Sequence, residues 1–322
     1  MNKDWSEKNK RIQELIGKKD TYKDGIKLLT EFRQEMFEQI KNIVNGFPTK
    51  AFYQMPYANA KGYHSKTLAY SIWHIFRIED IVAHTLILGD EQIFFAGDYQ
   101  KKTGAPIITA GNELKGSQIA DFSEKLNIKE LYEYAYSVML STNELLNKID
   151  YWCGKDVRGL IKMPFCRHWI MHIEAMQRIK NQLCKLARKG VDPVAYCGFS
   201  CNHCFLGQWC GSCRTEYNSC SFATCFENKT CPNAGCCQEK NIDGCYECDE
   251  LETCTKGFYT PENDGANAAK AQAMYIKKHG KKSFLKVHDR LHEKYEFAKT
   301  QEILGRDMYE GLNLLENVNK EK

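Results

Sequence analysis

Thirteen of the sixteen cysteines of this chain lie between Cys197 and Cys254. The apolar periodicity of the flanking sequence disappears in this segment, and glycine, asparagine and serine take over. Such a composition cannot bury enough apolar surface to fold unaided. The segment therefore needs crosslinks or bound metal, and this need is the strongest constraint on what the chain can fold into.

The compartment decides between crosslinks and metal. The first ten residues are highly charged with no apolar stretch behind them, so we expect no secretory signal. No apolar run approaches the roughly 20 residues that span a bilayer, so we expect no membrane partner. We expect a cytoplasmic protein, and disulfides are rarely maintained in the cytosol. The clustered thiols are therefore predicted to be metal ligands.

The charge pattern gives little support for a nucleic-acid partner. The net charge of +4 is spread over interleaved acids and bases. The basic run KKHGKK, residues 277–282, has no interleaved aromatic platform and is typical of a solvated helix end. Nucleic acid is therefore not expected as a partner. The oligomeric state stays open, a dimer included.

Up to about residue 190 the pattern predicts four long amphipathic helices. In the first, over 22–44, apolar residues recur every three or four positions. The second runs over 66–88, the third over 128–149 with Asn127 as its N-cap, and the fourth from near Pro164 to Gly190. Four such helices favour a four-helix bundle. The connection over 90–126 is too long for a simple hairpin, so it must cross the bundle or carry its own structure.

The chain is thus predicted to be mainly α, in three parts. Residues 1–190 form the four-helix bundle, and 191–258 form a small cysteine-rich, metal-stabilised module. Residues 259–322 form a helical C-terminal segment packed with that module. Its first helix is expected to end at Gly280.

Three histidines of the predicted bundle point toward its core. On a helical wheel His74 shares a face with apolar residues, and so do His168 and His172, which are one turn apart. Two imidazoles at that spacing and a third from a facing helix can bind one divalent ion, with zinc, nickel and iron suiting the site equally. The alternative is that each is a core histidine with a satisfied hydrogen bond, which is less favoured for three than for one. By contrast, His288 and His292 stand among charged residues and are predicted to lie on a solvated face.

Three protein ligands leave one coordination position open, where a metal acidifies water or a thiol. The sequence offers no general base for such chemistry. Glu79 and Asp80 lie off the His74 face and are predicted to be surface charges. The sequence therefore leaves open whether the chain is an enzyme.

The segments SIWHIFRIEDIVAHTLI and MPFCRHWIMHIEAMQRIK resemble the second and fourth helices of the DinB-like superfamily of metal-binding four-helix bundles. The resemblance covers roughly residues 22–189. It implies that His74, His168 and His172 bind a divalent metal, and that a small thiol or another small molecule is the substrate of a thiol transferase or hydrolase. Many members follow the histidine pair with R-G-Q, whereas this chain has Ile173, Glu174 and Ala175. This difference from the family pattern bears on the expected substrate chemistry more than on the expected metal binding.

The cysteine spacings C-x3-C-x2-C and C-x2-C are typical of tetrahedral thiolate sites, which hold zinc or iron–sulfur clusters. The thirteen candidate ligands would fill three four-ligand sites with one thiol left over. They are Cys197, Cys201, Cys204, Cys210, Cys213, Cys220, Cys225, Cys231, Cys236, Cys237, Cys245, Cys248 and Cys254. Of the cysteines outside the module, Cys166 is predicted to be a packing residue.

The first cysteine triplet also matches the cluster motif of radical-SAM enzymes. Those enzymes build a full or partial barrel after the motif, and a whole barrel takes about 250 residues, far more than remain here. As a whole, CGFSCNHC, WCGSC, CPNAGCC and GCYECDELETC resemble the cysteine-rich domain of unknown function 3795, over about 196–258. This resemblance implies a metal-binding role without an established reaction. Equally favoured is that the thiols serve only to fold the segment around zinc.

Two functions from different classes remain open. In the first, the chain is a metalloenzyme whose histidine site takes a small substrate while the cysteine module supports it or passes electrons. In the second, it is a non-enzymatic protein that binds or senses metal or redox state, with the helical part as a scaffold.

Overall fold

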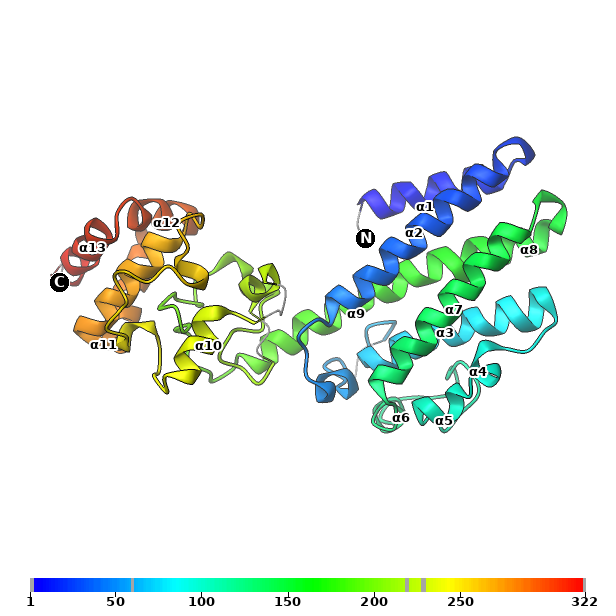
Figure 1. The fold of residues 1–322 in the computed structure, drawn as a ribbon, viewed down its shortest axis with the longest axis horizontal. Coiled ribbons are helices and arrows are strands. Elements are labelled where there is room, and N and C mark those ends of the chain that lie inside the picture. Colours follow the sequence, from blue (N-terminus) through cyan, green and yellow to red (C-terminus); the bar gives the residue numbers. More distant parts are fainter. Residues whose placement is uncertain (1–2, 59–60, 218–219, 227–229, 321–322) are drawn as a thin grey trace. The chain divides into compact units, whose positions relative to one another are not determined.

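The computed structural model describes residues 3–58, 61–217, 220–226 and 230–320, and divides the chain into two compact units, residues 1–183 and 184–322 (Figure 1). Both units are mainly helical, as predicted. Within the described ranges, β structure is limited to one isolated bridge between Val194 and Ser200. None of the described helices combines the length and apolar composition that crossing a bilayer requires.

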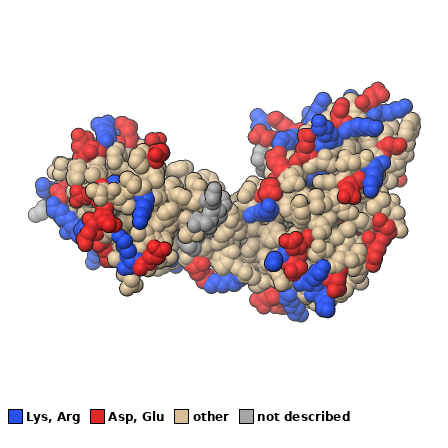
Figure 2. Space-filling model, viewed as in Figure 1, with Lys and Arg blue, Asp and Glu red and all other residues tan. Residues whose placement is uncertain are grey.

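The first unit contains long helices at the positions that the apolar spacing predicts. The elements are α1 (Lys3–Ile16), α2 (Tyr22–Ile43), α3 (Leu68–Asp80) with a π-helical continuation (Ile81–Leu88), α7 (Ile128–Lys148), α8 (Lys155–Lys162) and α9 (His168–Ala187). Helix α3 packs against α7, and α2 packs against both α1 and α7. Charged side chains of both signs are distributed over the visible face of this unit, among many other side chains (Figure 2).

The helix ends follow the local chemistry. The side chain of Asn127 accepts hydrogen bonds from the backbone N–H groups of Lys129 and Glu130, which confirms it as the N-cap of α7. The π-helical continuation of α3 ends at Gly89, whose φ of 68° is a left-handed conformation that favours glycine.

The connection between the second and third long helices carries its own structure. It contains three short helices, α4 (Ile93–Ala96), α5 (Tyr99–Thr103) and α6 (Gln118–Ser123). Helix α5 packs against α7 and α6 against α3. The connection therefore covers a side of α3 that would otherwise face solvent.

The fourth predicted helix does not begin at Pro164. Helix α8 precedes it, and Pro164 lies in a π-helical turn, Met163–Arg167, that joins α8 to α9. Proline has no N–H and its ring clashes with the carbonyl four residues back, which disfavours a regular α turn. The backbone N–H of His168 instead bonds to the carbonyl of Met163, five residues back. The wide turn thus directly precedes the first of the paired histidines.

Helix α1 was not predicted from the sequence. It buries Trp5, Ile12 and Ile16, and the ring of Trp5 meets that of Phe32 on α2 edge to face, with centroids 5.5 Å apart. Its apolar residues are sparse among lysines and glutamates, so its amphipathic face is visible only once α2 is in place.

The prediction that Glu79 is a surface charge is wrong. Both Glu79 and Arg33 are fully buried, and two guanidinium nitrogens of Arg33 donate to the two carboxylate oxygens of Glu79 at 2.9 and 2.6 Å. The same guanidinium donates to Asn143 on α7 and to the carbonyl of Phe165. The indole of Trp169 on α9 donates to Glu79 at 2.8 Å. One ion pair therefore contacts α2, α3, α7 and α9.

Asp80 is also buried, which corrects its prediction as a surface charge. It pairs with Arg77 at 3.0 Å and accepts a hydrogen bond from the hydroxyl of Tyr134 on α7. It also accepts from the backbone N–H groups of Ile93 and Phe94, at the start of α4. The carboxylate thus joins α3 to both α7 and the connection.

The second unit consists of the cysteine-rich segment, which contains one short helix, and three C-terminal helices. These helices are α10 (Pro232–Glu239), α11 (Ala266–Lys294), α12 (Phe297–Gly305) and α13 (Met308–Lys320). Among the described residues of the unit there are also four 3-10 turns: Phe205–Gln208, Ser221–Cys225, Cys245–Glu247 and Gly257–Tyr259. Gly280 interrupts α11 with a φ of 77°, at the residue where the sequence predicts a helix end.

The core of this unit mixes residues from the cysteine-rich segment with residues from the C-terminal helices. Tyr246 and Tyr259 of the segment are buried together with Ala273, Phe284 and Leu291 of α11. Gly198, with a φ of 83°, presses against Ala273 so closely that a Cβ at position 198 would lie 2.7 Å from the methyl carbon of Ala273. A fragment that ends near residue 260 would lose this shared core.

Removing the carboxylate of Glu79 should destabilise the first unit strongly. In Glu79→Leu the buried guanidinium of Arg33 loses its charge partner, which costs about 3–5 kcal/mol. Urea unfolding followed by circular dichroism measures the loss. The exposed Glu38, which pairs with Lys41 one turn away, provides the control, and Glu38→Gln should change stability by less than about 0.5 kcal/mol.

Adding Arg33→Met to Glu79→Leu removes the unpaired charge and should restore part of the lost stability. An unchanged unfolding midpoint in Glu79→Leu would mean that the pair does not hold the helices together.

Candidate metal centres

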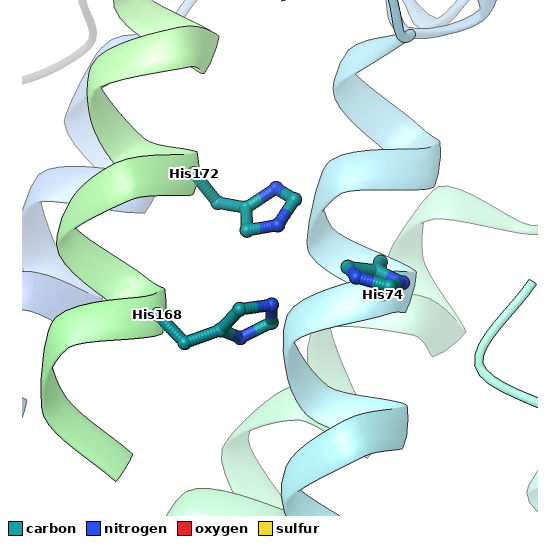
Figure 3. A group of neighbouring side chains, drawn as sticks. All are labelled: His74, His168 and His172. Atoms are coloured by element: carbon teal, nitrogen blue, oxygen red, sulfur yellow. The ribbon is translucent and has the colours of Figure 1, made fainter. Parts of the chain in front are cut away.

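Three imidazoles meet inside the first unit. His74 lies on α3, and His168 and His172 lie one turn apart on α9, with all three rings turned toward one another (Figure 3). All three residues are buried, and one ring nitrogen from each lies within 4.8 Å of the other two. The ring centroids are 4.6 to 5.2 Å apart. The structure therefore brings together the three residues that the sequence predicts.

The ring of His74 is held by the connection that covers α3. Its Nδ1 lies 2.7 Å from the carbonyl oxygen of Ala110, so this nitrogen carries the proton and donates to the carbonyl. The other ring nitrogen, Nε2, then carries the free lone pair. A backbone carbonyl that orients a histidine in this way is a common partner of metal-binding imidazoles.

The other two rings have polar atoms without partners. Within the described part of the chain, Nδ1 of His168 and both ring nitrogens of His172 are buried and make no hydrogen bond. Leaving such a group unpaired costs about 1–3 kcal/mol. Binding of a metal ion would satisfy one nitrogen of each ring, so the donor set fits a divalent ion.

Burial keeps these imidazoles neutral. Together with a smaller contribution from the neighbouring His74, it lowers the pKa of His168 to about 4. Burial also lowers the pKa of His172 well below the usual value, with His168, His74 and Lys66 adding to the effect. The pKa of His74 is lowered mainly by burial, against the raising effect of its bond to Ala110. Neutral imidazole is the form that binds a metal.

Lys66 is a neighbour of the histidines that sequence reasoning missed. Its ammonium lies 4.8 Å from the ring centroid of Tyr70, and that ring stacks on His74. Burial lowers the pKa of Lys66. On the α9 side, the ring of Tyr63 meets His172 edge to face at 4.9 Å. Tyr63 precedes the predicted helix and Lys66 lies at its first position, so the helical pattern gave no sign that either side chain meets the histidines.

Within the described residues, no carboxylate or thiolate joins the three histidines as a fourth ligand at this spacing. Three histidines with a free position are the ligand set of catalytic zinc rather than structural zinc. An ion held here would keep room for one small molecule.

Replacing His168 and His172 together by alanine should remove about one divalent ion per chain, because only His74 would remain. Elemental analysis of the full-length chain after dialysis against zinc measures this difference. His279→Ala is the control, since His279 lies in the second unit, where its ring contacts Glu316. Equal metal content in the double variant and the wild type would show that the three rings hold no ion.

The cysteines of the second unit line two separate cavities. The first, of about 230 Å³, is walled by phenylalanines and we call it the aromatic cavity. Seven cysteines line it: Cys197, Cys201, Cys204, Cys210, Cys213, Cys220 and Cys231. Its aromatic wall consists of Phe199, Phe205, Phe222, Phe258 and Phe297.

The second cavity, of about 260 Å³, is more polar and we call it the polar cavity. Lys240, Lys256, Glu250 and Asn233 contribute to its wall. Five cysteines line it: Cys236, Cys237, Cys245, Cys248 and Cys254. The two cavities thus take up twelve of the thirteen clustered thiols, in sets of seven and five.

The remaining cysteines lie outside both cavities. Cys225 is exposed and lines neither. Cys166 in the first unit is buried, its thiol donates to Asn9 at 3.3 Å, and burial raises its pKa to about 12. A thiol of that kind is not reactive, so Cys166 is a packing residue as predicted. Cys153 and Cys184 also lie outside the cysteine-rich segment.

In two cysteine pairs, a hydrogen bond from one thiol lowers the pKa of the other. The Sγ atoms of Cys237 and Cys245 lie 3.7 Å apart, and the hydrogen bond from Cys237 lowers the pKa of Cys245 to about 7. A hydrogen bond from Cys220 lowers the pKa of Cys210 to about 5, helped by the backbone N–H groups of Ser212 and Ser221. Each cavity therefore contains a thiol that is readily converted to the thiolate, the form that binds metal.

The prediction for His288 and His292 is wrong. His288 is fully buried, and with His292 and His203 it forms a cluster of rings whose centroids are 4.2 to 5.4 Å apart. His203, from the cysteine-rich segment, stacks on His292 and bonds to Asp289 at 2.7 Å. The charged neighbours on α11 do not make this a solvated face, because the loop that carries His203 covers it.

Stability of the second unit should fall in acid because of His288. Burial lowers its pKa to about 3, with His292 and His203 adding to the effect, whereas an unfolded chain has a histidine pKa near 6.5. Between pH 6.5 and 3, the unfolded state therefore binds a proton at this histidine and the folded state does not. The contribution of His288 to the free energy of unfolding is fully present above pH 6.5. It falls by about 1.4 kcal/mol per pH unit between pH 6.5 and 3.

Urea unfolding of the wild type and of His288→Phe across this range tests the effect. The difference in unfolding free energy between them should change with pH by that slope, because phenylalanine takes up no proton. Parallel curves would show that the pKa of His288 is not depressed.

Comparisons of the chain with protein-family models, with curated proteins and with solved structures found no match. The function is therefore argued from the two sets of ligands alone.

Proposed function

We propose that the chain is a DinB-like metalloprotein in which a four-helix bundle formed by α2, α3, α7 and α9 binds one divalent ion through His74, His168 and His172. The ion is zinc, nickel or iron, all of which bind neutral imidazole. The proposed activity is that of a metal-dependent thiol transferase or hydrolase acting on a small thiol or another small molecule. The observation that carries the proposal is the buried set of three histidines, with ring nitrogens that have no other partner in the described chain.

Residues beside the histidines suit an anionic or acidic substrate. A bound ion would lower the pKa of the thiol or water that occupies its fourth position. Lys66, whose ammonium lies over Tyr70 near His74, would attract a thiolate or a carboxylate group of the substrate. Tyr63, which contacts His172, would exclude water from the same side. Lys66 thus positions the substrate in this proposal, and the three histidines hold the ion.

The open coordination position can be tested with cobalt. In the cobalt-loaded full-length chain, a small added thiol should enter that position, change the visible d–d bands and add a sulfur-to-metal charge-transfer band. The His168→Ala, His172→Ala double variant separates this response from any cobalt bound by cysteines, and it should show no change on adding thiol.

Azide, tested in the same way, reports whether the position accepts any small anion. A spectrum that ignores thiols and azide alike would mean that the site is closed, and the enzymatic proposal would fail. Lys66→Met should weaken thiol binding at constant cobalt content, because only the positioning charge is removed.

A second candidate function is non-enzymatic sensing of metal or redox state. The observation that favours it is the two cysteine-lined cavities, each with a hydrogen-bonded thiol pair. In this proposal the cysteine module binds zinc or an iron–sulfur cluster, and gain or loss of that group changes the packing of the shared core. Removing metal from the thiols should then alter the amide spectrum of the second unit, and no change after verified removal would exclude sensing by this route.

A further inference from the structure

Apart from the pair Cys237 and Cys245, whose Sγ atoms lie 3.7 Å apart, the described cysteines of the second unit do not group around single ions. A zinc ion with Zn–S bonds of about 2.3 Å holds four sulfurs about 3.8 Å apart. Among the described residues, however, no three cysteines form a group close enough to hold one ion between them. The thiols instead surround two cavities of about 230 and 260 Å³. Four sulfurs that bind one ion leave no such space between them, so the spacing fits a larger group with several metal atoms.

We propose that each cavity holds one iron–sulfur cluster bound by thiolates, and that the two clusters lie close enough to interact. This inference rests on the proposed metal-binding role of the cysteine module and makes it specific. Iron–sulfur clusters are bound by four cysteine thiolates each, and the sets of seven and five thiols supply four to both.

The two cavities meet at one buried side chain. The amide of Asn233 donates to Sγ of Cys245 in the polar cavity at 3.6 Å, and its oxygen lies 3.8 Å from Sγ of Cys231 in the aromatic cavity. The backbone at Gly257 and Phe258 holds this amide in place, with the N–H of Phe258 donating to its oxygen at 2.6 Å. A single amide group therefore separates a thiol of one set from a thiol of the other.

The walls of the two cavities differ, so the two clusters should differ in reduction potential. The aromatic cavity presents phenylalanine rings, which exclude water from a cluster. In the polar cavity the ammonium of Lys240 lies 3.5 Å from Sγ of Cys248, and the amide of Asn233 bonds to Cys245. Positive charge and hydrogen bonds to the sulfurs stabilise the reduced, more negative state. The cluster of the polar cavity should therefore have the higher potential.

The first test is chemical analysis of the full-length chain, purified without oxygen, in the His168→Ala, His172→Ala background so that only the second unit contributes. The expected result is iron and acid-labile sulfide in about equal amounts. Zinc without sulfide would overturn the cluster proposal and leave the metal-binding role of the thiols intact. No metal bound by the thiols would overturn both.

The second test assigns the thiols. Cys245→Ser with Cys248→Ser leaves three thiols in the polar cavity, and serine at positions 201, 204, 210 and 213 leaves three in the aromatic cavity. Each of these two multiple variants should lose about half of the iron and sulfide. Cys225→Ser, at an exposed position, should keep all of both. A loss in Cys225→Ser equal to that in the two sets would overturn the grouping.

Lys240→Met tests the same grouping without removing a thiol, so it keeps the fold that the multiple variants put at risk. It should lower the reduction potential of one cluster and leave the other unchanged. Lys299→Met is its control, since Lys299 contacts only Glu302 among the contacts described for it. Equal shifts of both clusters, or no shift of either, would overturn the assignment.

The third test addresses the distance between the clusters. After reduction with dithionite, which supplies one electron to each cluster, the electron paramagnetic resonance spectrum should be broadened by interaction between the two spins. The variant that keeps one cluster should give a simple spectrum. Two unbroadened signals in the fully reduced wild type would show that the clusters are not neighbours.

Discussion

The first unit depends on a charge that it buries. Arg33 and Glu79 have no access to water, and the cost of desolvating them is offset only because every arm of the guanidinium and both carboxylate oxygens find partners. Those partners lie on four helices, so the helices can pack in only one register if the pair is to remain satisfied. Glu79 lies five residues from His74, and Trp169 is adjacent to His168. The same register therefore places the imidazoles opposite one another.

Local patterns predicted much of this unit. The spacing of Ile26, Leu29 and Phe32 identifies α2, and Asn127 begins α7 as a cap should. The three histidines could be placed because the inward face of a helix is a property of the helix itself. Glu79 and Asp80 could not be placed in this way. A helical wheel shows that they lie on the side opposite the core, and that side is expected to be solvated. Helix α3 is instead covered on several sides, by α7, α4 and α6.

The second unit shows where sequence reasoning stops. The cysteine spacings indicate metal, but the grouping of the thiols depends on how loops without periodicity fold back on α11. Cys231 and Cys237 are six residues apart on one short stretch, yet they line different cavities. The solvated face predicted for His288 is wrong for the same reason, because the residue that covers it, His203, is 85 positions away along the chain. Packing partners so distant in sequence leave no local signal.

The π-helical turn at Pro164 has a consequence for how this part of the chain tolerates changes in length. A π turn contains one residue more than the α turn that it replaces, so it is equivalent to a single insertion accommodated inside a continuous helix. Helix α8 is thereby rotated about its axis by roughly 100° relative to the phase that α9 would impose on it. The two helices consequently present independent faces to their neighbours. The turn absorbs the extra residue locally, so the histidine pair keeps its orientation whatever face α8 needs to bury.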